Sequence, residues 1–192
     1  MTLFLQGRSG VGKSRLLQET LAPYVKEIAG FTVQRLKING AAAGFRVVNI
    51  ENGFAPLEAV YAPEMTGVFI FRGRRDVFAL EEAILRLEEE SCGPQCKLVL
   101  LDEIGGIELS SRIFMDALKR IISSDKPCCG VFKSFENLIH TASKLKLKKE
   151  YAEYHRELAS LLEEKGELLT VTEQNYLSLR DYLSASFRPV FL

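Results

Sequence analysis

The first residues that could do chemistry lie in a glycine-rich segment near the N-terminus. This segment, GRSGVGKS, satisfies the spacing G-x-x-x-x-G-K-[ST]. Its glycines let consecutive backbone N–H groups converge on a phosphate without obstruction from a Cβ atom. Lys13 can reach the β- and γ-phosphates of a nucleotide, and the Ser14 hydroxyl can bind Mg²⁺. The predicted nucleotide-binding residues are Gly7, Arg8, Ser9, Gly10, Val11, Gly12, Lys13, Ser14 and Arg15.

A second candidate follows an apolar run. Residues 97–101 (KLVLL) precede Asp102 and Glu103 directly. A carboxylate at the carboxyl end of a buried strand suits Mg²⁺ beside a phosphate loop, so Asp102 and Ser14 are the predicted metal ligands. A carboxylate at Glu103 can polarise the water that attacks the γ-phosphate, whereas a kinase takes its acceptor from a second substrate. The predicted catalytic residues are therefore Glu103 and Lys13, with Mg²⁺ as cofactor.

Other cations could contact the γ-phosphate, because phosphoryl transfer is favoured by positive charge there. Lys133 follows the apolar run 127–132, and strand ends of this kind face a ligand crevice, which makes Lys133 a candidate contact. The three arginines of residues 72–75 favour a solvated loop instead. The four lysines of residues 144–149 are more typical of a solvated helix face, with a mobile cationic lid as the alternative.

The elements that must position these residues alternate between strands and helices. An alternating run at residues 2–6 predicts a strand before the glycine-rich segment, and leucines at helical spacing predict a helix after it. Asn39-Gly40 between alternating runs predicts a β-hairpin within about residues 30–60. Ser110 is the predicted N-cap of an amphipathic helix that carries Ile113, Phe114 and Leu118. Residues of about 134–166 are predicted to form charged helices.

This order predicts one α/β domain over residues 1–192. Its sheet is expected to be mainly parallel, with the hairpin as an insertion and the segment of about 134–166 as a helical excursion.

The composition narrows the class of protein. The chain has 192 residues, 47% of them hydrophobic, which is enough for a substantial core. Its 25 basic and 25 acidic residues balance, which is unlike a nucleic-acid-binding protein. No apolar run is long enough for a membrane span, and the start leaves no room for a secretory signal. We therefore expect a cytoplasmic protein with neither a nucleic-acid nor a membrane partner. Its four cysteines are expected to be reduced thiols rather than zinc ligands.

A longer run carries a family resemblance. Residues 102–114, DEIGGIELSSRIF, resemble the DEIG-x-[MI]-E-L-x-S-x-x-F signature of the small P-loop nucleoside-triphosphatases. The Gly-Phe pairs at residues 30 and 44 and the VTEQN of residues 171–175 are similar as well. The resemblance implies a P-loop NTPase three-layer sandwich of RecA/AAA-like type. It also implies Mg²⁺-dependent hydrolysis of nucleoside triphosphates, with magnesium at Ser14 and Asp102 and water activation at Glu103.

The chain also departs from that family pattern. Val33 and Arg35 replace polar and acidic residues of the hairpin, and Tyr176 stands where the family commonly has Arg. Two alternatives therefore stay open. One is a nucleotide or small-metabolite kinase that uses residues 135–165 as a lid. The other is a slow nucleotide-dependent switch that binds a protein partner, or a second copy, through the same helices. The base preference and any arginine donor are left open by the sequence.

Overall fold

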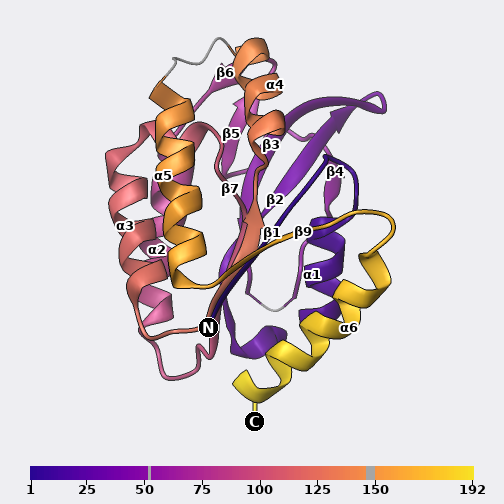
Figure 1. Cartoon of the computed structure of the whole chain (residues 1–192). Coiled ribbons are helices and arrows are strands. Elements are labelled where there is room, and N and C mark those ends of the chain that lie inside the picture. Colours follow the sequence, from indigo (N-terminus) through magenta and orange to yellow (C-terminus); the bar gives the residue numbers. More distant parts are fainter. Residues whose placement is uncertain (52, 146–149) are drawn as a thin grey trace.

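The computed structural model describes residues 1–51, 53–145 and 150–192 (Figure 1). The strands are β1 (Thr2–Gln6), β2 (Ile28–Ile38), β3 (Ala41–Asn49), β4 (Glu58–Val60), β5 (Val68–Phe71), β6 (Arg74–Arg75), β7 (Leu98–Ile104), β8 (Cys128–Phe132) and β9 (Glu167–Thr170). The helices are α1 (Lys13–Leu21), α2 (Phe78–Ser91), α3 (Arg112–Ser123), α4 (Phe135–Leu145), α5 (Glu150–Lys165) and α6 (Tyr176–Phe187).

One sheet organises the molecule, with the strand order β6-β5-β3-β2-β7-β8-β1-β9 and with β4 paired to β2. The strands from β2 through β7, β8 and β1 to β9 are mutually parallel. β7 and β8 are almost wholly buried, as expected for strands covered on both faces, which explains their continuous apolar sequences. The predicted α/β class with a mainly parallel sheet is confirmed.

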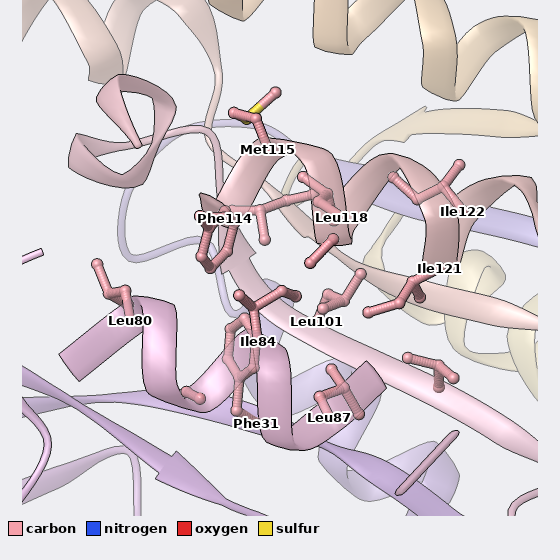
Figure 2. Close-up of a cluster of buried hydrophobic side chains, with 14 of the residues drawn as sticks. Phe31, Leu80, Ile84, Leu87, Leu101, Phe114, Met115, Leu118, Ile121 and Ile122 are labelled. Atoms are coloured by element: carbon pink, nitrogen blue, oxygen red, sulfur yellow. The ribbon is translucent and has the colours of Figure 1, made fainter. Parts of the chain in front are cut away.

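Helices cover both faces of the sheet and give three layers (Figure 1). α2, α3 and α5 pack on one face and α1 and α6 on the other, each over its own buried apolar cluster. Figure 2 shows the first cluster, where Ile84 of α2 and Leu118 of α3 lie on either side of Leu101 of β7. α3 begins after Ser111, whose hydroxyl accepts a hydrogen bond from the Phe114 N–H, so the cap is one residue later than predicted.

The β2–β3 hairpin is continuous with the parallel sheet. The first half of β2 pairs in parallel with β7, from Ile28↔Leu98 to Thr32↔Asp102. The same strand pairs along its length with β3 in antiparallel register, and β5 and β6 extend that antiparallel edge. The segment predicted as an insertion therefore supplies a core strand, because β2 is long enough to serve both pairings.

The described parts of the segment of about 134–166 form α4 and α5, in agreement with the predicted helices. Tyr151, Leu158 and Leu162 of α5 are buried, whereas Tyr154 is 40% exposed. The predicted apolar stripe thus packs mainly on the domain itself. Lys146, Lys148 and Lys149 of the basic cluster lie outside the described residues. Within the described ranges, no helix is long and apolar enough to cross a membrane.

Candidate active site

The glycine-rich segment connects the carboxyl end of β1 to the start of α1. Gly12 has φ +96° and forms the left-handed N-cap of α1, so the helix begins at Lys13 with its first amide groups facing the loop. Gly7 has φ +136°, and a Cβ there would lie 2.5 Å from the Val171 carbonyl oxygen. Both glycines are therefore required by backbone geometry. The segment has the strand–loop–helix context that a phosphate-binding loop needs.

Lys13 points back into its own loop. Its Nζ donates to the carbonyl oxygens of Gly7 and Arg8, at 2.9 Å each. The side chain is buried, and burial lowers the pKa of Lys13 although Glu103 and Asp102 oppose the shift. The ammonium group of Lys13 is thus held inside the loop by two carbonyl oxygens. Phosphate oxygens of a bound nucleotide would compete with these carbonyls for its hydrogen bonds.

Ser14 and Asp102, the two predicted metal ligands, are in direct contact at the sheet edge. Ser14 Oγ donates to Asp102 Oδ1 at 2.9 Å. Asp102 Oδ2 is buried without a hydrogen-bond partner in the described part of the chain, and burial raises the pKa of this carboxyl to about 7. A buried carboxylate oxygen without a donor is costly unless a cation satisfies it. A hydroxyl and a carboxylate are oxygen ligands of the kind that Mg²⁺ prefers, so these residues fit that ion.

Glu103 and Lys133 form an ion pair at the ends of neighbouring strands. Lys133 Nζ lies 2.5 Å from Glu103 Oε1, and both side chains are partly exposed to the same cleft. Burial lowers the pKa of Lys133, but the negative charges of Glu103 and Glu108 outweigh it, and the net shift is upward. The predicted water-activating carboxylate and the candidate γ-phosphate cation are therefore in direct contact.

Glu108 shapes the turn that follows Glu103. Its buried carboxylate accepts the backbone N–H groups of Gly105 and Gly106, at 2.5 and 2.7 Å. Burial raises the pKa of Glu108, and the hydrogen bonds from the backbone oppose that shift. Gly105 has φ +95°, a conformation that favours glycine. In the sequence, Glu108 stood only within the run that carries the family resemblance, and no role was predicted for it.

Asn137 of α4 is a cleft residue that sequence reasoning missed. Its Nδ2 donates to the Gly7 carbonyl at 3.1 Å, beside the bond that Lys13 makes to the same oxygen. The one available signal was its position four residues after Lys133, in a helix that starts where β8 ends. The first turn of the helical excursion is therefore part of the phosphate-binding loop's surroundings.

His155 of α5 packs against the carboxyl end of β8. It is 3% exposed, its ring stacks on Phe132 at 4.4 Å, and its Nε2 lies 2.6 Å from the Lys133 carbonyl oxygen. Because a carbonyl only accepts, Nε2 carries the proton. Burial, first, lowers the pKa of His155, which favours the neutral ring.

A cleft of about 1120 Å³ brings these groups together and has two chemically different halves. The phosphate half contains Ser9 to Arg15, Asp102, Glu103 and Lys133. The apolar half is formed by Val33 of β2, Phe45 of β3 and Phe69 and Ile70 of β5. The ion pair of Arg35 with Glu58, at 3.3 Å, lies beside the apolar half.

Among the predicted cations, Arg15 is exposed and lines the cleft, whereas Arg8 is exposed outside it. The arginines of residues 72–75 are exposed and do not line the cleft. In the residues that the structure describes, no three His, Cys, Asp or Glu side chains gather as a metal cluster.

The strand order completes the definition of the class. β8 lies between the strand before the phosphate loop and the strand that carries Asp102 and Glu103. A glycine-rich loop, a hydrogen-bonded Ser–Asp pair and a following glutamate on such a sheet are typical of P-loop nucleotide-hydrolysing proteins. Residues 2–186 match the family model described as NTPase, and the chain belongs to this family.

Known proteins agree with this family assignment. The chain is 32% identical over 131 residues to a mouse protein named cancer-related nucleoside-triphosphatase homolog, covering 64% of this chain and 69% of that one. It is 25% identical over 184 residues to nucleoside-triphosphatase THEP1 of Methanocaldococcus jannaschii, covering 91% and 90%. The crystal structure of THEP1 from the hyperthermophile Aquifex aeolicus superposes with a TM-score of 0.61 at 18% identity, covering 98% and 99%. That last likeness supports the P-loop NTPase fold.

Proposed function

We propose that this NTPase converts nucleoside triphosphates to the diphosphate and phosphate with bound Mg²⁺, using Lys13 and Glu103 as its catalytic residues. The observation that carries the proposal is the meeting of two pairs in one cleft. Ser14 is hydrogen-bonded to Asp102, a pair of oxygen ligands that would hold Mg²⁺, and Glu103 forms an ion pair with Lys133 in the same cleft.

The geometry suggests how each group acts. The loop amides and Lys13 would bind the phosphates, with Lys13 exchanging the carbonyls of Gly7 and Arg8 for phosphate oxygens. Ser14 and Asp102 would hold Mg²⁺, which neutralises phosphate charge when bound. Glu103 would orient the attacking water and accept its proton as the bond to the γ-phosphorus forms and the bond to the bridging oxygen breaks. Lys133 would bring positive charge to the phosphoryl group as it is transferred to water, and the nucleoside diphosphate is the leaving group.

Phosphate release from ATP, GTP, CTP and UTP tests this assignment in three proteins. We expect Glu103→Gln to lower kcat by about 10²- to 10⁴-fold, the range for loss of a general base, while ADP affinity by calorimetry is retained. Lys13→Ala should lose turnover and weaken nucleotide binding. Undiminished turnover in Glu103→Gln would contradict the water-activating role.

A kinase activity is a second candidate that one observation favours. The apolar half of the cleft is formed by Val33, Phe45, Phe69 and Ile70, whose side chains cannot bind phosphate. Such a surface fits a second, largely apolar substrate, whose hydroxyl would replace water as the acceptor. In that case phosphate release without an acceptor would be negligible. Steady phosphate release from nucleotide and Mg²⁺ alone would exclude this candidate.

A nucleotide-dependent partner-binding role is the third candidate. α4 carries Asn137 at the phosphate loop and, on its surface, Phe135 and Ile139, which are 42% and 49% exposed. One helix thus connects the glycine-rich loop to an exposed apolar surface. Light scattering with and without ADP tests whether this surface joins two copies, and co-purification tests for another partner. A monomer in both states, turning over rapidly without a partner, would speak against this role.

A further inference from the structure

The order of the strands determines the direction in which a bound triphosphate lies. Glu103 and Lys133 mark the γ-phosphate end, at the carboxyl ends of β7 and β8. β1 and then β9 follow on the far side of β8 from β7. In the proposed function, the rest of the nucleotide would extend from there past Ser14 and the first turn of α1, which also line the cleft. This direction would bring the base toward β9 and α6.

Tyr176, the first residue of α6, lies where this path ends. A Cβ on Gly12 would be 2.9 Å from Tyr176 Cε2 and 3.6 Å from its hydroxyl, so the ring rests on the phosphate loop itself. Tyr176 is half-buried and lines the same cleft as Ser14 and Arg15. Burial, and then the charge of Glu19, raises the pKa of Tyr176, so its phenol is neutral.

The loop before Tyr176 is fixed by hydrogen bonds that need no ligand. The Thr172 N–H donates to Asn175 Oδ1 at 2.7 Å, and the Asn175 N–H donates to Thr172 Oγ1 at 3.3 Å. Asn175 Nδ2 also donates to the Thr170 carbonyl at 2.9 Å, at the end of β9. The ring is therefore held in place before a nucleotide arrives, which lowers the entropic cost of binding.

We propose that Tyr176 is the platform on which the nucleobase stacks, with Arg15 beside it. This inference rests on the proposed function and specifies the base subsite of the same cleft. An aromatic face attracts a base through dispersion and quadrupole interactions and does not read its hydrogen-bonding edge. The contact area is larger for a purine than for a pyrimidine. Tyr176 should therefore favour adenine and guanine over uracil by affinity rather than by exclusion.

Calorimetry with ADP, UDP and pyrophosphate tests the platform without requiring turnover. We expect Tyr176→Ala to weaken ADP by about 5- to 150-fold, the range for loss of one base–aromatic stack, and UDP by less. Pyrophosphate has no base, so its affinity should stay within twofold of wild type. Tyr176→Phe retains the ring and should bind ADP like wild type. Leu177→Ala is the matched control, because Leu177 follows on α6 and is 64% exposed.

Two results would overturn the platform. Unchanged ADP affinity in Tyr176→Ala would show that the base does not contact the ring. Equal weakening of ADP and pyrophosphate would show that Tyr176 only supports the loop at Gly12. Absence of phosphate release from wild-type protein would contradict the proposed function instead, and would leave the stacking result intact because binding is measured with diphosphates.

Discussion

The phosphate-binding loop and the residues that surround it are built in different ways. In the loop, Lys13 bonds to carbonyls five and six residues before it, so its geometry is set by one short segment. The surrounding residues, which we call the supporting group, come from separate elements and are Glu108, Lys133, Asn137 and His155. Asn137 lies 130 residues from the Gly7 oxygen that it contacts. Under the proposed function, this difference predicts that the loop determines nucleotide affinity and that the supporting group determines kcat.

Lys133 offers the strongest test of this division. Lys133→Met removes the cation beside Glu103 and keeps an unbranched side chain of similar length. We expect kcat to fall about 100-fold, comparable to the loss of one group that stabilises transition-state charge, with ADP affinity within twofold of wild type. Phosphate-release kinetics and calorimetry measure the two quantities.

Lys126→Met is the matched control. Lys126 precedes the opposite end of the same strand, where its Nζ donates to the Cys96 carbonyl. Normal kcat is expected for this variant. A Lys133→Met protein that loses ADP affinity but not kcat would break the comparison, because Lys133 would then belong with the loop.

Glu108 tests the supporting group through stability. Glu108→Ala leaves the N–H groups of Gly105 and Gly106 buried without their acceptor, and an unsatisfied buried donor costs about 1–3 kcal/mol. We expect the free energy of unfolding to fall by about 2 kcal/mol or more by urea denaturation. Glu108→Gln retains an acceptor oxygen and should be milder. Equal losses in the two variants would mean that the negative charge, rather than the two hydrogen bonds, is what matters.

The same division explains what the sequence could predict. The loop, the Ser14–Asp102 pair and the position of Glu103 were predictable, because each depends on local spacing and on the end of one apolar run. The α/β class followed from the alternation of strand and helix patterns. The prediction of Lys133 required only that neighbouring parallel strands end at one edge.

The pairing of strands across the sheet was harder to predict from the sequence. The hairpin looked like an insertion because β2 shows one alternating pattern, and nothing local reveals that its first half also pairs with β7. Asn137 and His155 have no motif of their own. Their contacts depend on where α4 and α5 pack, which is a property of the tertiary structure. Ser111 rather than Ser110 caps α3, a one-residue difference that two adjacent serines cannot resolve.

Substitution of Asn137 should have a smaller effect. It tests the contact between the supporting group and the phosphate-binding loop. Asn137→Ala removes one hydrogen bond to the Gly7 carbonyl, and a bond of this kind contributes about 0.5–1.5 kcal/mol. We expect kcat/KM for ATP to fall by about two- to tenfold. Ser143→Ala, at an exposed position on the same helix, should have no effect. A loss in both variants would attribute the change to α4 as a whole rather than to the Gly7 contact.

Substitution of His155 has the smallest expected effect, a change in how stability depends on pH. The pKa of His155 is lowered in the folded protein, first by burial, so the unfolded chain binds a proton more readily than the folded one. The stability contributed by the neutral ring is therefore present above the unfolded pKa of about 6.5 and is lost as pH falls toward the lower folded pKa. Asp102, with its raised pKa, acts in the opposite direction, but it is common to both proteins in the comparison.

The test compares the urea midpoints of wild type and His155→Gln at pH 7.5 and at pH 5. We expect the wild-type midpoint to decrease more than the His155→Gln midpoint as the pH is lowered. Gln can still donate to the Lys133 carbonyl, so kcat at pH 7.5 should change little. A parallel pH dependence in the two proteins would contradict the lowered pKa of His155 in the folded protein.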